Sequence, residues 1–277
     1  MSDRPVVSVV VPFFDSERHI GASIESLLGQ TAVGGPFEVI FVDNGSKDGS
    51  PGIVRRYPDL IVLEELTPGA YAARNAGLRK ARAPLIAFTD ADCVVDRDWL
   101  RSVRDGMQDP TVGVLLGHCR YPPEASLGLR LLGVYENAKA EYVTSRCAPA
   151  HHFAYANNMA VRASLFERLG PFKEWKRAGD SELAHRLASS GEKLRLVYRP
   201  SMRVTHMEFL RSRDRARRLS LYSETNQQIE TFRELGVAQR VGVLLHLLRG
   251  RRPDILTKPS MPRPGPPQSS CARRRQT

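Results

Sequence analysis

The sequence predicts an α/β protein with a doubly wound, mostly parallel sheet, helices on both of its faces, and a C-terminal helical segment. One observation is that apolar strand-like runs alternate with helical apolar stripes through residues 6–89. The other is that polar clusters at 12–15, 43–48 and 89–92 each follow a strand-like run directly. Ligands bind such sheets beyond the carboxyl ends of the strands, so the three clusters predict one site at one edge.

The N-terminal half contains four expected strands. Residues 6–11 are a β-branched run, typical of a strand covered on both faces. Asp15 or Ser16 can cap the next helix, whose apolar stripe is Ile20, Ile24, Leu27 and Leu28. The other three strands are expected at 37–42, 60–63 and 85–89. The second helix is the Ala-rich segment at 70–82.

The second half continues the alternation. A helix starting at Asp98, a helical segment at 126–143 and a helix from about Ser181 to Gly191 are expected. The expected strands lie at 112–116, 155–161, 194–198 and 202–205. After about residue 250 the chain holds six prolines and many polar groups, which predicts disorder.

Bulk composition limits the class of protein. The 277 residues are 42% hydrophobic and 26% charged, as in ordinary globular proteins. No apolar run approaches the ~18–20 residues that span a bilayer, and the N-terminus lacks a signal-peptide core. Four dispersed cysteines form no CxxC pair, which argues against a zinc ribbon or a disulfide framework. A cytoplasmic location is expected.

The net charge of +11 lies mostly at the C-terminal end. Residues 251–277 carry seven basic groups against one Asp, which is +6, and residues 207–250 add +3. The main body is therefore nearly neutral, which counts against a nucleic-acid-binding fold. Residues 237–248 are apolar and flanked by arginines. They predict either a basic helix on an anionic membrane surface, the favoured interpretation, or a helix packed on the main domain.

Asp90 and Asp92 follow the strand at 85–89. Residues two apart on extended backbone share a side, so both carboxylates can address one ligand. Their mutual repulsion is relieved by a cation, and oxygen ligands suit Mg²⁺ or Mn²⁺. A turn after the strand explains the same two acids equally well.

The remaining candidates are each open to two interpretations. Asp43 begins a turn-rich loop and can also accept hydrogen bonds from a ribose or a base, although no G-x-G-x-x-G follows the first strand. Arg74 can pair with phosphate or lie on the surface. Asp180 and Glu182 suit a helix N-terminus, and a carboxylate there can also serve as a general base. His206 follows the last strand and is a ligand or a structural residue.

Taken in order, these segments resemble the inverting nucleotide-sugar glycosyltransferases of family 2, which have the Rossmann-like GT-A fold. The likeness covers about residues 6–206 and rests on six segments: VSVVVPFFDSE at 7–17, IESLLGQT at 24–31, residues 37–50, ARNAG at 73–77, TDAD at 89–92, and GPF at 170–172 with GDSEL at 179–183. The family usually has E-D-x-D-L at the last position. Gly179 stands in place of the first acid, so that support for the base is missing.

The resemblance implies a role for each residue. Asp180 would be the base, with Glu182 as an acceptor-binding or backup base. Asp92 and His206 would ligate a divalent metal, Mn²⁺ or Mg²⁺, that bridges the donor diphosphate. The expected donor-binding residues are Pro12, Phe14, Asp15, Asp43, Arg74, Asn75, Asp90 and Ala91.

The resemblance also implies a domain plan and an activity. Residues 1–206 would form the catalytic domain, with a nucleotide-binding half at about 1–95 and an acceptor-binding half at about 96–206. A helical region at 207–250 and a basic tail at 251–277 would follow. The expected reaction is non-processive, metal-dependent, inverting transfer of a hexose from a nucleotide sugar, with UDP-sugar preferred. The expected acceptor is a hydroxyl of a glycan, a lipid-linked molecule or a small molecule.

That reaction is expected in cell-envelope polysaccharide synthesis, at the inner face of the membrane if the C-terminal helix binds there. A sugar nucleotidyltransferase is one alternative, but it normally needs a basic Gly-rich loop where residues 12–16 read PFFDS. A non-catalytic scaffold that binds nucleotide sugars is the other.

Overall fold

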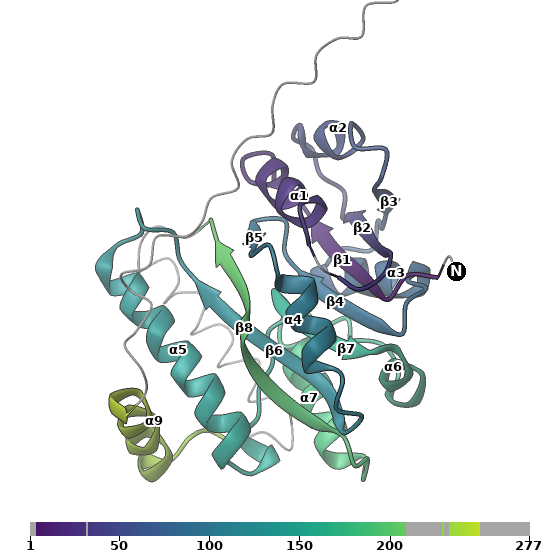
Figure 1. The fold of residues 1–277 in the computed structure, drawn as a ribbon. Helices are drawn as coiled ribbons and strands as arrows, with labels where there is room; N and C mark the ends of the chain where they lie inside the picture. Colours follow the sequence, from purple (N-terminus) through teal and green to yellow (C-terminus); the bar gives the residue numbers. More distant parts are fainter. Residues whose placement is uncertain (1–3, 32, 209–228, 230–232, 250–277) are drawn as a thin grey trace, which may run out of the picture.

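The computed structural model describes residues 4–31, 33–208, 229 and 233–249, and these contain an eight-stranded sheet with the order β3-β2-β1-β4-β7-β6-β8-β5 (Figure 1). β7 runs antiparallel to β4 and β6, β5 runs antiparallel to β8, and all other neighbours are parallel. The mostly parallel sheet predicted from the sequence is confirmed. The strands are β1 (Val7–Phe13), β2 (Phe37–Asp43), β3 (Ile61–Glu64), β4 (Leu85–Thr89), β5 (Cys93–Val95), β6 (Val112–Arg120), β7 (Asn158–Arg162) and β8 (Arg195–His206).

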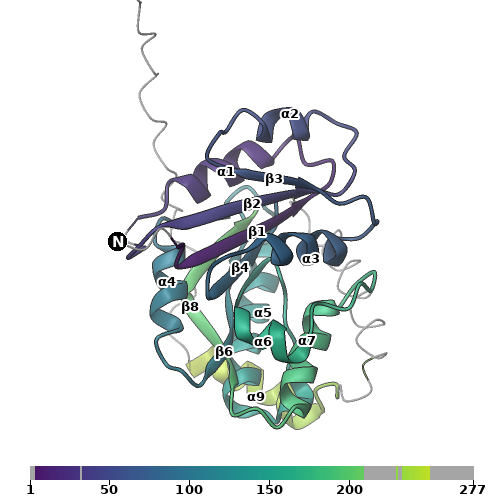
Figure 2. The ribbon, with the colours of Figure 1, turned by 90° about the vertical axis from the view of Figure 1, so that its right-hand side faces the viewer.

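Helices cover both faces of this sheet, as predicted. Ile24 of α1 and Trp99 of α4 lie in one apolar core, whereas Phe166 of α6 and Leu183 of α7 lie in a second core with residues of α3. Figure 2 shows α4 on one side of the strands and α3, α6 and α7 on the other. The helices are α1 (Ile20–Leu28), α2 (Ser50–Val54), α3 (Ala70–Lys80), α4 (Trp99–Gly106), α5 (Leu127–Arg146), α6 (Ala163–Leu169), α7 (Gly179–Ser189) and α9 (Val237–Arg249), with a 3₁₀ turn η1 (Pro149–His151).

The position of β1 inside the sheet explains why its sequence is mostly apolar, with Ser8 as a buried polar residue whose hydroxyl donates to Glu38 (2.6 Å). Val9 and Val11 contribute to the core under α1 and α4, while Val10 contributes to the core under α3. All three side chains are fully buried. Alternate residues of a strand point to opposite faces, so a strand covered on both faces has no position for a polar side chain that lacks a partner.

The first helix begins later than predicted, at Ile20, and neither Asp15 nor Ser16 caps it with its side chain. Asp15 instead accepts a hydrogen bond from the Lys47 backbone N–H (2.8 Å), and the Ser16 hydroxyl donates to the Phe14 carbonyl (3.1 Å). Both side chains are thus used in the loop: Asp15 has a tertiary partner, and Ser16 bonds to a carbonyl two residues before it.

The two short strands predicted at 194–198 and 202–205 are one strand, β8. Pro200 lies inside it as an exposed residue, and the pairing with β6 shifts register between Gly117 and His118. This irregularity lets the strand continue past a residue that cannot donate a backbone hydrogen bond. The sequence did not predict β5, α2 and α6, because these elements are too short to show a clear periodicity of apolar residues.

α9 packs against α5, which confirms the packed interpretation of residues 237–248, whereas contact of the same helix with a membrane stays a prediction. Val243 is fully buried, and the His246 Nε2 lies 3.3 Å from a Glu141 carboxylate oxygen. Among the described residues, no helix is long and apolar enough to cross a membrane. The tail at 251–277, predicted to be disordered, lies outside the described residues, as does most of 207–236.

Gly77 allows α3 to approach β1 closely, which yields the first prediction. A Cβ at this position would lie 2.4 Å from the Val10 Cγ1 atom, and Val10 is held in the middle of the sheet. We expect Gly77→Ala to lower the free energy of unfolding by about 1–3 kcal/mol, because the overpacked side chain cannot be accommodated. Urea unfolding followed by circular dichroism measures this difference.

The matched control is Gly21→Ala in α1, where an added Cβ meets no atom within 4 Å. That substitution should stabilise the protein by about 0.5–1 kcal/mol through helix propensity alone. If both variants changed stability in the same direction, the close approach at Gly77 would not be the reason for its glycine.

Candidate active site

The polar clusters predicted to share a sheet edge do lie together. Phe13 and Asp43 are register partners at the ends of β1 and β2, and Asp90 follows β4, the other neighbour of β1. The backbone N–H of Asp15 donates to the Ser46 hydroxyl (3.1 Å), which adds a second bond between the two loops. Pro12 is buried within β1, whereas Phe14 is 57% exposed at the rim.

The loop after β2 is fixed by Asp43 and by a residue that the sequence reading did not single out, Asn44. Asp43 is buried and accepts a hydrogen bond from the Ser46 backbone N–H (2.9 Å). The Asn44 amide donates to the carbonyls of Glu65 and Thr67 and accepts from the Gly69 N–H (2.8 Å) at the start of α3. No local pattern predicts these contacts, since they join residues more than twenty positions apart.

Arg74 is buried and joins two of the predicted site acids. Its guanidinium forms an ion pair with Asp90 (2.5 Å), lies 5.2 Å from the centre of the Tyr71 ring, and exerts its charge on Asp180. The alternative interpretation of Arg74 as a surface residue is therefore wrong. A cation between two carboxylates reduces the repulsion that would otherwise keep them apart.

Asp180 is a buried carboxylate with an ordered set of donors. It accepts hydrogen bonds from the backbone N–H groups of Ala156 (2.8 Å) and Ser181 (2.9 Å), and the Tyr71 hydroxyl also favours its ionised form. Burial raises the pKa of Asp180, while the charge of Arg74 and these hydrogen bonds oppose the rise. A fixed carboxylate with increased proton affinity is suited to accept a proton from a substrate hydroxyl.

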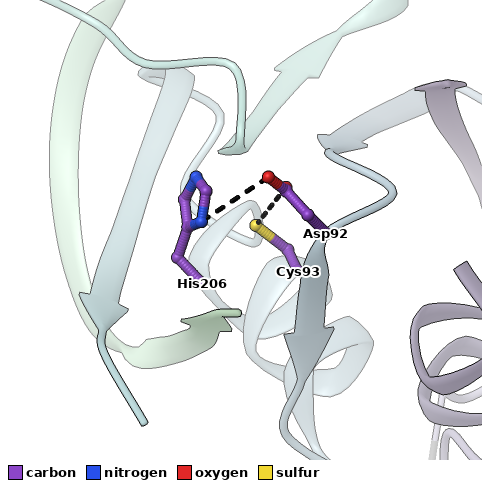
Figure 3. A group of neighbouring side chains, drawn as sticks. All are labelled: Asp92, Cys93 and His206. Carbon is purple, nitrogen blue, oxygen red and sulfur yellow. Dashed lines mark hydrogen bonds and ion pairs between the residues drawn. The ribbon is translucent and has the colours of Figure 1, made fainter. Parts of the chain in front are cut away.

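A second group of side chains lies where β5 pairs with β8. Potential ligand atoms of Asp92, Cys93 and His206 all lie within 4.8 Å of one another (Figure 3). Cys93 and His206 are register partners, and the His206 Nδ1 lies 3.6 Å from an Asp92 carboxylate oxygen. The antiparallel pairing of β5 and β8 brings together two predicted ligands that are more than a hundred positions apart.

The donor chemistry of this group fits a divalent metal held by Asp92 and His206. The Cys93 thiol donates to Asp92 (3.7 Å), and burial followed by the charges of Asp92 and Asp90 raises the pKa of the Cys93 thiol well above its ordinary value. The sulfur is therefore a protonated partner of Asp92. One carboxylate and one imidazole remain as ligands, with positions left for phosphate oxygens, and this set suits Mn²⁺ or Mg²⁺.

Three other predicted residues have mainly structural contacts. The Asn75 amide donates to the Phe172 carbonyl (3.0 Å) and accepts from the Phe172 N–H (3.1 Å), which ties α3 to the segment before α7. Glu182 pairs with Arg186 (2.8 Å), and Ala91 is buried between the two acids. Direct contacts of Asn75 or Ala91 with a donor, and of Glu182 with an acceptor, stay predictions.

Comparison with known proteins identifies the family to which the sequence is similar. The family model "Glycosyl transferase family 2" matches residues 8–170. Glycosyltransferase AglE of Haloferax volcanii is 29% identical over 177 residues, which are 62% of this chain and 57% of that protein. This chain spans about half the length of the curated relatives it matches.

Two solved structures share the fold. A mannosyltransferase of Pyrobaculum calidifontis, PcManGT, in complex with GDP-Man and Mn²⁺, aligns with a TM-score of 0.60 at 26% identity, covering 88% of this chain and 69% of that one. TarS residues 1–349 of S. aureus in complex with UDP aligns with a TM-score of 0.57 at 19% identity, covering 87% and 70%, and shows the fold alone. With a family model matched over more than half of its length and the GT-A fold, the chain belongs to glycosyl transferase family 2.

Proposed function

We propose that this chain is a glycosyltransferase that moves a hexose from a nucleoside-diphosphate sugar to an acceptor hydroxyl with inversion. The observation that carries the proposal is the position of Asp180. The positive charge of Arg74 stabilises the ionised form of this carboxylate, and Arg74 is also paired with Asp90 at the donor edge of the sheet. A proton acceptor and a donor-binding edge are therefore parts of one site.

Each residue of the site has a separate role in the proposed reaction. Asp180 removes the proton from the acceptor hydroxyl as that oxygen attacks the anomeric carbon, and the bond from that carbon to the diphosphate breaks on the opposite side. Asp43 contacts the nucleoside and Asp90 the ribose region. A divalent cation held by Asp92 and His206 would supply Lewis-acid stabilisation of the charge that grows on the diphosphate.

Family membership and the metal-compatible pair support this proposal. PcManGT is described with GDP-Man and Mn²⁺, and TarS with UDP, so both bases occur among proteins of this fold. For this chain we propose a UDP-sugar. A calorimetric binding screen of UDP-, GDP- and dTDP-sugars with Mn²⁺ present tests that choice, and tighter binding of a GDP-sugar would replace it.

The role assignments predict different losses at Asp92 and Asp180. Asp180→Asn should bind the nucleotide sugar normally and lower its turnover by roughly 10²–10⁴-fold, because the proton acceptor is lost. Asp92→Asn should lose its turnover, and it should also lose the part of donor binding that depends on Mn²⁺. Release of nucleoside diphosphate from UDP-glucose, UDP-N-acetylglucosamine and GDP-mannose measures turnover, and calorimetry measures binding.

Asp109→Asn is the control for both variants, because Asp109 is a partly exposed acid that pairs with Arg195 outside the site. Near wild-type turnover in Asp180→Asn would show that another residue is the base. Mn²⁺-dependent binding by the wild-type protein with no turnover of any donor, with or without glycan acceptors, would favour the non-catalytic scaffold.

We also propose that α9 attaches the protein to an anionic membrane surface. Five apolar side chains on α9 are 44–81% exposed, and their positions at i, i+4, i+7, i+8 and i+11 place them on one helical face: Val237, Val241, Leu244, Leu245 and Leu248. α9 contains no acidic residue, and the sequence after it reads GRR. Both views place α9 away from α1 and α2 of the proposed nucleotide-binding half (Figures 1 and 2).

Substituting this apolar face should abolish membrane binding. The wild-type protein should float with phosphatidylglycerol-containing vesicles and less with pure phosphatidylcholine, whereas Leu244→Glu combined with Leu248→Glu should stay in the dense fraction. Leu66→Glu is the control, since Leu66 is a single exposed leucine (73%) between β3 and α3. Equal flotation of the α9 variant and the wild type would contradict the proposal.

A further inference from the structure

The helix start that carries Asp180 differs from the related motif at one position, and the structure shows what occupies the space. An added Cβ at Gly179 would lie 2.7 Å from the Lys173 carbonyl oxygen and 3.1 Å from two atoms of the Tyr71 ring. The carbonyl belongs to the backbone, so it cannot rotate away as a flexible side chain could. A side chain at 179 and the Tyr71 ring therefore compete for the same volume.

Tyr71 is held in that volume from three sides. Its side chain is 4% exposed, its ring centre lies 5.6 Å from that of Phe172, and the Arg74 guanidinium lies 5.2 Å from the ring centre. With Gly179 on the remaining side, the ring has a fixed orientation. The ring so held lies beside residue 179, and its hydroxyl favours the ionised form of the neighbouring Asp180 carboxylate.

We propose that Tyr71 is a positioning residue for Asp180, and that Gly179 is needed because it leaves room for the Tyr71 ring. The proposal rests on the proposed role of Asp180 as the base. In this chain a phenol hydroxyl supports the base, at the place where the related motif has an acidic neighbour. Asp180 is then oriented by one side-chain donor and two backbone donors.

The groups that face Asp180 set the direction of the expected pH effects. Among the described residues, Arg74 and Tyr71 of α3 face it, and Asp90 lies on the far side of Arg74. The Tyr71 hydroxyl stabilises the ionised carboxylate, so removing it must raise the pKa of Asp180 further. The base would then remain protonated up to a higher pH.

Tyr71→Phe tests this directly, since it keeps the ring and removes only the hydroxyl. We expect kcat for nucleoside diphosphate release from the nucleotide sugar that binds to fall roughly tenfold, as for the loss of one hydrogen bond to a charged group. KM for the donor should stay unchanged, and the acidic limb of the kcat profile should move to higher pH. Tyr198→Phe is the matched control, because the Tyr198 hydroxyl is buried and donates to Asn137 (3.2 Å) outside the site.

A stability measurement makes the test independent of turnover. The folded-state pKa of Asp180 is raised, so stability is lost as pH rises through it, and Tyr71→Phe should enlarge that loss. The difference in unfolding free energy between wild type and Tyr71→Phe should therefore grow from about pH 4 to about pH 8. In an Asp180→Asn background the difference should not depend on pH.

Gly179→Ala adds a second variant. It should reproduce the shift of Tyr71→Phe and add little to it in the double variant, because both remove the same contact. A Tyr71→Phe protein with unchanged kcat, an unmoved acidic limb and a pH-independent stability difference would overturn the proposal, even if Asp180→Asn abolished turnover. Retained turnover in Asp180→Asn would instead overturn the proposed function.

Discussion

The site depends on a buried cation, Arg74, held between carboxylates from two halves of the fold. Asp90 follows β4 of the N-terminal half, and Asp180 begins α7 far along the chain. Burying a guanidinium is costly unless it is paired, and a buried carboxylate near a second carboxylate is costly unless a cation acts on both. The ion pair of Arg74 with Asp90 meets the first requirement and its charge acting on Asp180 meets the second, so Arg74 links the proposed base to the donor edge.

The antiparallel strand β7 joins the two halves of the sheet, which allows Asp90 and Asp180 to lie near the same arginine. It pairs with β4 on one side and β6 on the other, with Thr89 opposite Asn158. The sheet of the N-terminal half therefore continues without a break into the strands of the second half. The same continuity allows β5 to return beside β8, which places Asp92 next to His206.

Several residues in or beside the predicted site act in the structure as supports for their neighbours. Asn75 holds the segment that precedes α7, Glu182 pairs with Arg186 one turn on, and Cys93 donates to Asp92. A reactive side chain at a sheet edge needs such partners, because without them it would adopt several rotamers and would not keep the orientation that binding requires. The segments that resemble the family thus contain both the acting residues and the groups that hold them.

The sequence by itself determined the sheet class, the order of the main strands and helices, and the edge at which the site lies. Apolar periodicity reports burial, and polar clusters after parallel strands must meet at one edge. Only the tertiary structure decided which residues meet across long separations: Asn44 with Gly69, His206 with Asp92 and Cys93, and the Tyr71 ring with Gly179 beside Asp180. Local patterns cannot report these contacts, because each depends on strand register and on the volume of a distant neighbour.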